Sequence, residues 1–378
     1  PVIPPPQATL TAGSTGRIMD PNYRTPVTEQ WNGGYTWAIN TKTVFEAEYV
    51  HVLSLHENKT INLDPNIPVT PNNITTLSRT GTPGGFFRPL DAAFKAAGVP
   101  VLASVRDEAA AGRSRYDGMN LSFRQRSFHK TDLTVNYTLA RAVGYDEDGG
   151  SFRYYPRDPQ RPLDPNEFGP AANDERHHLT IATTSHMPYG LELSPILQFG
   201  SARPYLVTAT NNMLNLGGGS SAGAMIVTNA APNNLLSAAQ LTPIVDSSSS
   251  IPSIALAEAA CYYSGNCHIV PYNSLRGDPY FDVDMRLAKS IKLGSEKREL
   301  KLIFQAFNLF NHANYGNDFG GNTNSLSTIK DLTVPISNKR QIMTPDSTFG
   351  NALGFINPSG NGTLPRAFVA EFGARFTF

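Results

Sequence analysis

The chain has 378 residues, and its 31 lysines and arginines balance its 31 aspartates and glutamates. This neutrality excludes nucleic acid, anionic lipid and other strongly charged partners that are recruited by net charge. No apolar run approaches the ~18 residues of a membrane-spanning helix, whereas a membrane β-barrel is compatible with the sequence. The charged fraction of 16% lies below the ~25% of ordinary soluble domains, and 31 glycines with 29 prolines favour loop-rich β structure.

The chain begins Pro1-Val2-Ile3-Pro4-Pro5-Pro6, with neither an initiator methionine nor a basic segment followed by an apolar signal core. We therefore expect a processed chain or a fragment. The length allows one large β domain or two or three ordinary domains.

Alternation of apolar and polar residues recurs along the chain in segments of transmembrane-strand length. It predicts nine strands, near residues 27–39, 42–54, 114–127, 130–143, 176–187, 190–202, 279–292, 299–310 and 366–378. The last segment shows the pattern best. Its apolar face carries Phe368, Ala370, Phe372, Ala374, Phe376 and Phe378, and Glu371 and Arg375 lie on the other face.

The connections between the predicted strands alternate in length. Tight turns are predicted at Asn40-Thr41, Phe128-His129, Pro188-Tyr189 and Gly294-Ser295, and long connections at 55–113, 144–175, 203–278 and 311–365. Within these connections we expect a short helix in the alanine-rich stretch 90–105 and a strand at 224–227. Outer-membrane barrels have short periplasmic turns and long extracellular loops, so the rhythm favours such a barrel over a soluble β-sandwich. Barrels of a single chain have an even number of strands, so we expect further strands upstream of Pro1.

Cys261 and Cys267 are the two cysteines, and they lie six residues apart in a turn-rich stretch. We interpret them as a local disulfide formed in an oxidising compartment. Two free thiols and a metal site are the alternatives, although two ligands without a second pair make a poor zinc site.

Charged residues recur on one face of the last predicted strands. The candidates to line the interior, or lumen, of a barrel are Asp282, Asp284, Arg286, Lys301, Glu371 and Arg375. We interpret them as a network that pairs across strands, with direct contact to a ligand as the alternative. Lipid-facing or girdle positions are predicted for Trp31, Tyr35, Trp37, Tyr49, Phe281 and the terminal phenylalanines.

Two short motifs receive ordinary structural interpretations. Arg276-Gly277-Asp278 spells an adhesion tripeptide, which we interpret as a chance occurrence in a turn before a strand. His177, His178 and His186 suggest a metal site, but adjacent residues of a strand point to opposite faces, so no metal is expected. No spacing indicates a catalytic triad, a nucleophile elbow or a phosphate-binding loop, and we expect neither an enzyme nor a cofactor.

In family order, several stretches resemble TonB-dependent outer-membrane receptors, particularly Oar-like receptors with a carboxypeptidase-regulatory-like domain. They are Thr25-Pro26-Val27-Thr28-Glu29-Gln30-Trp31-Asn32, Glu48-Tyr49-Val50, Arg176-His177-His178-Leu179, Pro188-Tyr189-Gly190, Gly200-Ser201-Ala202-Arg203-Pro204-Tyr205, Phe281-Asp282-Val283-Asp284-Met285-Arg286-Leu287-Ala288-Lys289 and Phe304-Gln305-Ala306-Phe307-Asn308-Leu309-Phe310-Asn311-His312. The resemblance covers the chain from about Arg17 onward and implies the C-terminal half of a barrel of about 22 strands. It also implies that Gly373, Phe376 and Phe378 belong to the signal read by the outer-membrane assembly machinery.

The resemblance implies uptake of an unknown extracellular ligand, with TonB acting through a plug that these 378 residues do not contain. The implied partners are outer-membrane lipid, the rest of the barrel with its plug, the TonB complex and the assembly machinery. Residues 1–26 are expected to be a lead-in segment or loop remnant, and 27–378 the barrel portion. The implied location is the bacterial outer membrane, with the long loops extracellular and the C-terminus periplasmic. A surface adhesin or assembly barrel is the alternative, and a complete small barrel enzyme is a third.

Overall fold

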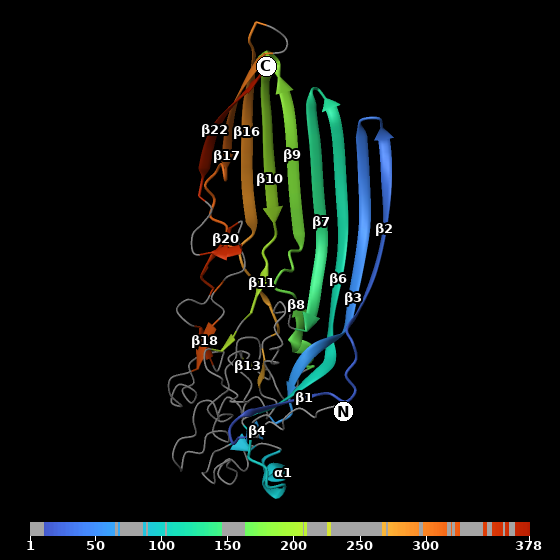
Figure 1. Cartoon of the computed structure of the whole chain (residues 1–378), viewed down its shortest axis with the longest axis vertical. Helices are drawn as coiled ribbons and strands as arrows, with labels where there is room; N and C mark the ends of the chain where they lie inside the picture. The colour runs from blue at the N-terminus through green and yellow to red at the C-terminus, as the bar shows by residue number, and fades with distance from the viewer. Residues whose placement is uncertain are drawn as a thin grey trace, which may run out of the picture.

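The computed structural model describes residues 11–64, 90–102, 104–145, 163–206, 271–294, 298–315, 319, 350–357 and 367–378, and the backbone of short strands between these ranges. Most of the described residues belong to one large β-sheet, drawn in Figure 1. Among them no helix is long and apolar enough to cross a membrane.

The main path of the sheet contains nine strands that follow each other in chain order. They are β2 (Val27–Asn40), β3 (Thr43–Asn62), β6 (Ser104–Phe128), β7 (Thr131–Tyr145), β9 (His177–Met187), β10 (Leu191–Gly200), β16 (Tyr280–Lys292), β17 (Glu299–Phe307) and β22 (Val369–Thr377). Every neighbouring pair on this path is antiparallel. The nine strands predicted from alternation are thus confirmed, and so is the all-β fold class with an antiparallel main sheet.

Tight connections gather at one end of the sheet. Figure 1 shows the turns after β2, β6 and β9 at the end where the C-terminus lies, and the long connections at the opposite end. The β6–β7 turn uses His129 and Lys130 with φ of 48° and 63°, and β9 joins β10 through the single turn η3 (Pro188–Gly190). Positive φ at two successive residues matches the right-handed twist of antiparallel strands, which keeps such hairpins short.

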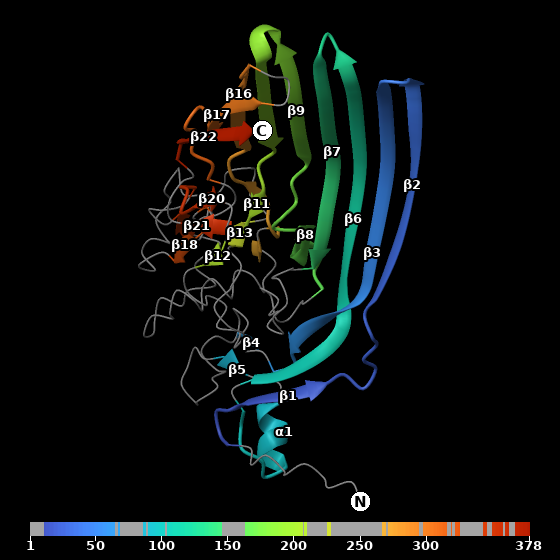
Figure 2. The same cartoon turned by 45° about the horizontal axis from the view of Figure 1, so that its top comes forward.

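Two strands are longer than their sequence pattern predicts. β3 continues eight residues beyond the predicted end at 54, and β6 begins ten residues before the predicted start at 114. Residues 106–113 read Arg-Asp-Glu-Ala-Ala-Ala-Gly-Arg, so alternation does not indicate a strand there, and register shifts interrupt the pairing between Leu55 and Lys59. In Figure 2 these ends of β3 and β6 bend away from the other strands. β1 (Thr15–Met19) pairs in parallel with the start of β6.

The remaining elements are short. They are η2 (Pro165–Glu167), β4 (Ile67–Pro68), β5 (Phe86–Phe87), β8 (Phe168–Pro170), β11 (Pro204–Tyr205), β12 (Thr208–Ala209), β13 (Met225–Val227), β14 (Cys267–Ile269), β15 (Leu275–Arg276), β18 (Asn322–Ser325), β19 (Met343–Pro345), β20 (Phe355–Asn357) and β21 (Gly360–Gly362). The expected short helix is α1 (Asp91–Ala96), but residues 104 and 105 belong to β6 instead. The strand expected at 224–227 is β13, and it pairs with β14.

The sheet is a single open layer. Within the described strands, β2 pairs only with β3 and β22 only with β17. The buried apolar residues are few and mostly small: Leu102, Val105, Ala109, Ala140, Val143, Ala171, Tyr272, Ala288 and Ala306. Large aromatic side chains stay uncovered instead, with Trp31 56% exposed, Tyr35 72% and Phe372 83%. This is not a two-layered globule with its phenylalanines packed inside.

Candidate functional site

The strand register aligns apolar side chains in rows that cross the sheet. One row contains Trp37, Phe45, Phe123, Val135, Ile181, Leu197 and Val283. The next row contains Tyr35, Ala47, Leu121, Tyr137, Leu179, Phe199 and Phe281. Directly opposed residues of antiparallel strands point to the same side, so these rows form one surface, here called the apolar face. It includes the five girdle candidates named individually from the sequence and, of the terminal phenylalanines, Phe372 and Phe376 on β22.

The opposite side of the sheet, here called the polar face, carries hydrogen-bonding side chains. One of its rows contains Thr36, Glu46, Ser122, Asn136, Thr180, Gln198 and Asp282. Neighbours on this face bond to each other. Ser122 Oγ donates to Asn136 Oδ1 within one row at 2.9 Å, and Asn32 Nδ2 donates to Glu48 Oε1 between adjacent rows at 2.9 Å. These hydrogen bonds between side chains satisfy the polar groups that the strands hold on this face.

The six predicted charged residues all lie on the polar face. Arg286 stands opposite Gln305, which stands opposite Glu371, and Lys301 stands opposite Arg375. Among the described contacts, Glu371 and Arg375 do not enter an ion pair. That these residues line the lumen of a closed barrel stays a prediction.

The ion pairs on this part of the polar face centre on Glu192 of β10. Arg286 Nη1 lies 2.9 Å from one carboxylate oxygen of Glu192, and Lys301 Nζ lies 3.1 Å from the other. Asp284 of the same strand as Arg286 accepts a hydrogen bond from the backbone N–H of Asn308. Glu192 alternates with apolar residues in the sequence, so its face was predictable. Its partners were not, because they depend on the register of three strands.

A cavity of about 310 Å³ opens on the polar face at the end where the long connections lie. Its walls combine strand residues with residues of two connections: Tyr116, Thr138, Ala140, Ala142, Asn173, Asp174, Glu175, His178 and Arg203. Small side chains at Ala140 and Ala142 leave the space, and ionisable groups surround its rim. We call this the loop-end cavity.

Asp174 anchors one side of the loop-end cavity. Its side chain is 0% exposed, and Oδ2 lies 2.6 Å from Arg276 Nη2. Oδ1 accepts from the Ala142 N–H at 2.7 Å, and Arg276 Nη1 also donates to the Asp174 carbonyl at 2.7 Å. The guanidinium of the Arg276-Gly277-Asp278 tripeptide is therefore held by Asp174, and its interpretation as a chance match stays a prediction.

Glu175 forms the opposite side of the same cavity. Its carboxylate lies 2.9 Å from Arg203 and 2.6 Å from His178 Nδ1. A Cβ at Gly200 would stand 2.4 Å from Glu175 Oε1, so a larger residue there would require this carboxylate to shift. His177 points the other way and meets the hydroxyl of Tyr137 at 2.7 Å. The two adjacent histidines lie on opposite faces, as predicted.

The apolar face ends toward the long connections at a polar cluster. Asp117 accepts a hydrogen bond from the Tyr49 hydroxyl at 2.7 Å and lies 2.7 Å from His51 and 2.9 Å from Arg115. The Trp31 ring packs 5.1 Å from the Tyr49 ring. Aromatic and charged groups meet here as they do at a membrane–water interface.

Beyond this cluster, the ends of β3 and β6 extend away from the apolar face together with β1. Burial raises the pKa of Asp107 on this extension, and the neighbouring carboxylates of Asp20 and Glu108 raise it further. Burial likewise raises the pKa of the Tyr205 phenol in β11. Neither group contacts the loop-end cavity.

Two sequence predictions concern residues outside these surfaces. Cys261 lies outside the described residues, and only the backbone of Cys267 is described, so the disulfide stays a prediction. Gly373 and Phe376 lie on β22 and Phe378 follows it, with Phe376 exposed on a strand that has one described partner. Their role as an assembly signal stays a prediction as well.

A family model described as "Outer membrane beta barrel domain" matches residues 1–343 of the chain. The chain belongs to this family. Membership places it in the bacterial outer membrane. No curated protein matches the chain.

The chain is also similar to parts of several solved outer-membrane protein structures. The outer membrane transporter YddB from Escherichia coli has 13% identity and a TM-score of 0.42, over 80% of this chain and 31% of that chain. The ferric-catecholate import receptor Fiu from E. coli has 9% identity and a TM-score of 0.39, over 94% and 28%. The FrpB iron transporter from Neisseria meningitidis has 10% identity and a TM-score of 0.37, over 96% and 32%. The chain thus spans less than a third of the length of these proteins.

Proposed function

We propose that this outer-membrane barrel chain is the C-terminal part of a TonB-dependent receptor of the Oar-like type, which takes up an extracellular ligand. The observation that carries the proposal is the single-layer sheet with one apolar and one polar face. In outer-membrane barrels the outward residues meet lipid and the inward residues line the lumen. The apolar face then contacts lipid, and the polar face with its Glu192 cluster lines the channel. The sequence resemblance supports the receptor class.

The same proposal orients the chain. Short turns of outer-membrane barrels are periplasmic and long loops extracellular. The C-terminus and the tight turns then face the periplasm, and the loop-end cavity faces the outside. The remaining partners are the rest of the barrel, the plug, the TonB complex that acts on the plug, and the assembly machinery that captures β22.

The loop-end cavity supports a role in contacting ligand. Glu175, His178 and Arg203 offer donors and acceptors at its rim, while Tyr116 and Thr138 offer hydroxyl groups in its wall. Groups that are held by ion pairs are pre-organised, which lowers the entropy lost when a polar ligand binds. We propose that the cavity binds its ligand without covalent chemistry.

The experiment compares solutes left in the growth medium by the source bacterium. Strains lacking this gene, and separately lacking TonB, are grown beside the parent, and the spent media are analysed by mass spectrometry. The expected result is at least one solute that the parent depletes and both mutants leave behind. An adhesin predicts instead a loss of surface attachment with no solute shared by the two mutants, and that result would refute uptake.

A matched pair of variants of the full-length protein tests the cavity. Glu175→Gln keeps the shape but weakens the pairs with Arg203 and His178, so depletion of that solute should slow by about tenfold, in line with ~1.5–3 kcal/mol for a hydrogen bond to a charged group. Ser122→Ala lies on the polar face outside the cavity lining and should leave depletion unchanged. Equal rates in the two variants would exclude the cavity as a ligand contact.

A further inference from the structure

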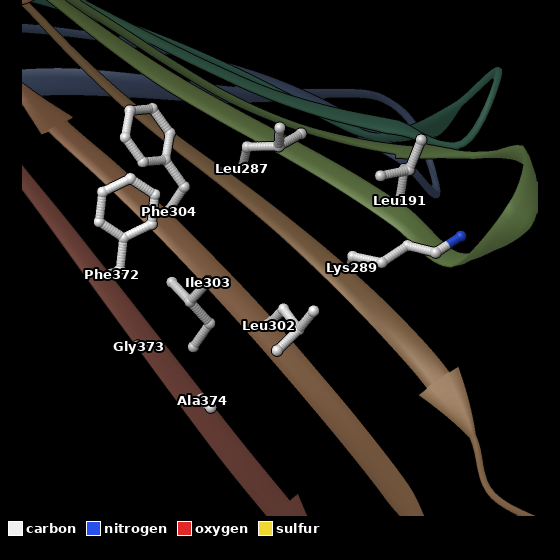
Figure 3. Close-up of a pocket in the computed structure, with 9 residues that line it drawn as sticks. All are labelled: Leu191, Leu287, Lys289, Leu302, Ile303, Phe304, Phe372, Gly373 and Ala374. Atoms are coloured by element: carbon white, nitrogen blue, oxygen red, sulfur yellow. The ribbon is translucent and has the colours of Figure 1, made fainter.

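A groove lies on the apolar face near the tight-turn end, where the proposed function requires only general contact with lipid. Its volume is about 500 Å³, within the ~300–1,000 Å³ typical of small-molecule sites. Strands β10, β16, β17 and β22 form it, as Figure 3 shows. The side chains that define it are Leu191, Leu287, Lys289, Leu302, Phe304 and Phe372.

The groove results from a step in side-chain size. The tilted rings of Phe304 and Phe372 pack with centroids 5.0 Å apart and form a wall at one end. Along β22 the next lining residues are Gly373 and Ala374, and Ala374 stands opposite Leu302. Leu302 is therefore left 44% exposed beside a low wall. A hollow with this apolar lining suits a hydrocarbon chain.

Lys289 is the one charged residue in the groove lining. The register places it between Leu191 and Leu302, at the other end from the two phenylalanine rings. Its ammonium donates a hydrogen bond to the carbonyl of Tyr189 in the tight turn η3. A lysine ammonium has three donors, so two N–H groups stay available beyond the Tyr189 carbonyl.

The groove therefore combines an apolar trough with a fixed cation where the strands end. Glu192 follows Leu191 on β10, but its side chain belongs to the polar face and pairs there with Arg286 and Lys301. The lining itself contains no acidic residue. Lysines close to a membrane surface attract anionic lipid, and their stems extend along apolar surface.

We propose that this groove binds one anionic phospholipid, with an acyl chain along Leu302 and Phe304 and the phosphate at Lys289. The proposal rests on membership of the outer-membrane barrel family and on this geometry, not on uptake or on TonB. Its test and that of the proposed function can therefore fail separately.

The test measures lipid retained by the purified full-length gene product. The protein is reconstituted in vesicles of equal phosphatidylglycerol and phosphatidylcholine, extracted in detergent and analysed by native mass spectrometry. The expected result is one retained phosphatidylglycerol per protein in excess of phosphatidylcholine. Absence of retained lipid, or equal retention of the two lipids, would overturn the proposal.

Variants separate the cation from the trough. Lys289→Gln should lower phosphatidylglycerol retention about fivefold, as removal of one lysine at a membrane surface implies. Lys292→Gln removes the same charge three residues along β16, on the other face, and should change nothing. Lys289→Arg keeps the charge and should keep the lipid. Unchanged retention in Lys289→Gln would overturn the role of the cation.

A further variant fills the trough and leaves Lys289 in place. Ala374→Phe puts a ring beside Leu302 and should abolish retention of phosphatidylglycerol in folded protein. Folding of each variant is checked by its heat-modifiable migration in gels. If Lys289→Gln does not fold, the other two variants still test the proposal. Retention of phosphatidylglycerol in Ala374→Phe, or its loss in Lys289→Arg, would contradict the proposal.

Discussion

Arg276 joins residues that lie about a hundred positions apart in the chain. Its guanidinium bonds both the buried carboxylate and the backbone carbonyl of Asp174, and it also donates to the carbonyl of Ala202 at 3.1 Å. The carboxylate of Asp174 is fully buried, and Arg176 lies 3.7 Å from it as a second cation. One side chain thus ties together the connections that shape the loop-end cavity.

Replacing Arg276 with alanine should destabilise this end of the sheet. Loss of one partner of a buried ion pair costs about 3–5 kcal/mol, and Arg176 should keep the loss near the lower value of about 3 kcal/mol. Hydrogen-exchange mass spectrometry of the full-length protein should show faster exchange at residues 171–176 and 201–206. Arg141→Ala is the control, because Arg141 is exposed on the other face of β7. Unaltered exchange in Arg276→Ala would contradict a structural role for the pair.

The tight turns depend on residues that accept positive φ. Gly190 ends η3 with φ of 73°, and a Cβ there would stand 2.6 Å from the carbonyl oxygen of Ser290. Gly294 follows β16 with nearly the same φ, 74°, and no described atom lies within 4 Å of its Cβ position. The two glycines therefore separate backbone strain from steric contact between neighbouring hairpins.

Alanine at these two positions should have unequal effects. Left-handed backbone costs an L-residue about 1–2 kcal/mol, so both Gly190→Ala and Gly294→Ala should lower the free energy of unfolding by this amount. Gly190→Ala should lose more, because the new methyl group must push β16 away from the turn. Urea unfolding of the full-length protein in vesicles measures the difference. Equal losses would mean that the contact with Ser290 relaxes without cost.

The molecule as a whole lacks a conventional hydrophobic core in its described part. Its largest apolar side chains stand on a single sheet layer with no second layer against them. In water such a surface would aggregate, whereas in a bilayer the acyl chains cover it and backbone pairing satisfies the N–H and C=O groups. The stability of the sheet therefore depends on the membrane as its solvent.

Arginine scanning of one strand tests this dependence. Leu197→Arg on the apolar face should destabilise the protein by about 2 kcal/mol, within the ~2–4 kcal/mol measured near a bilayer midplane. Gln198→Arg is one residue further on the polar face, opposite Asp282, and should stay within about 0.5 kcal/mol of the parent. Urea titration of vesicle-embedded protein checks both values. Similar losses at the two positions would refute the assignment of the faces.

The strands and their faces could be predicted from local pattern alone. Side chains in a strand alternate strictly, so Phe281, Val283 and Leu287 separate from Asp282, Asp284 and Arg286 without knowledge of any neighbour. The lengths of the connections likewise distinguish the tight hairpin turns from the long connections. The extension of β3 and β6 was missed because 106–113 carries no alternation. There β6 pairs both with β3 and with β1, which lies almost ninety residues earlier.

The sites depend on tertiary structure for a different physical reason. The loop-end cavity requires Glu175, His178 and Arg203 to meet, and the Glu192 cluster requires Arg286 and Lys301 from two later strands. These contacts arise from the register of several hairpins at once, and a shift of one residue would send each side chain to the other face. The alternation of side chains along a strand decides on which face a residue lies, but only the assembled sheet decides which residues meet on that face.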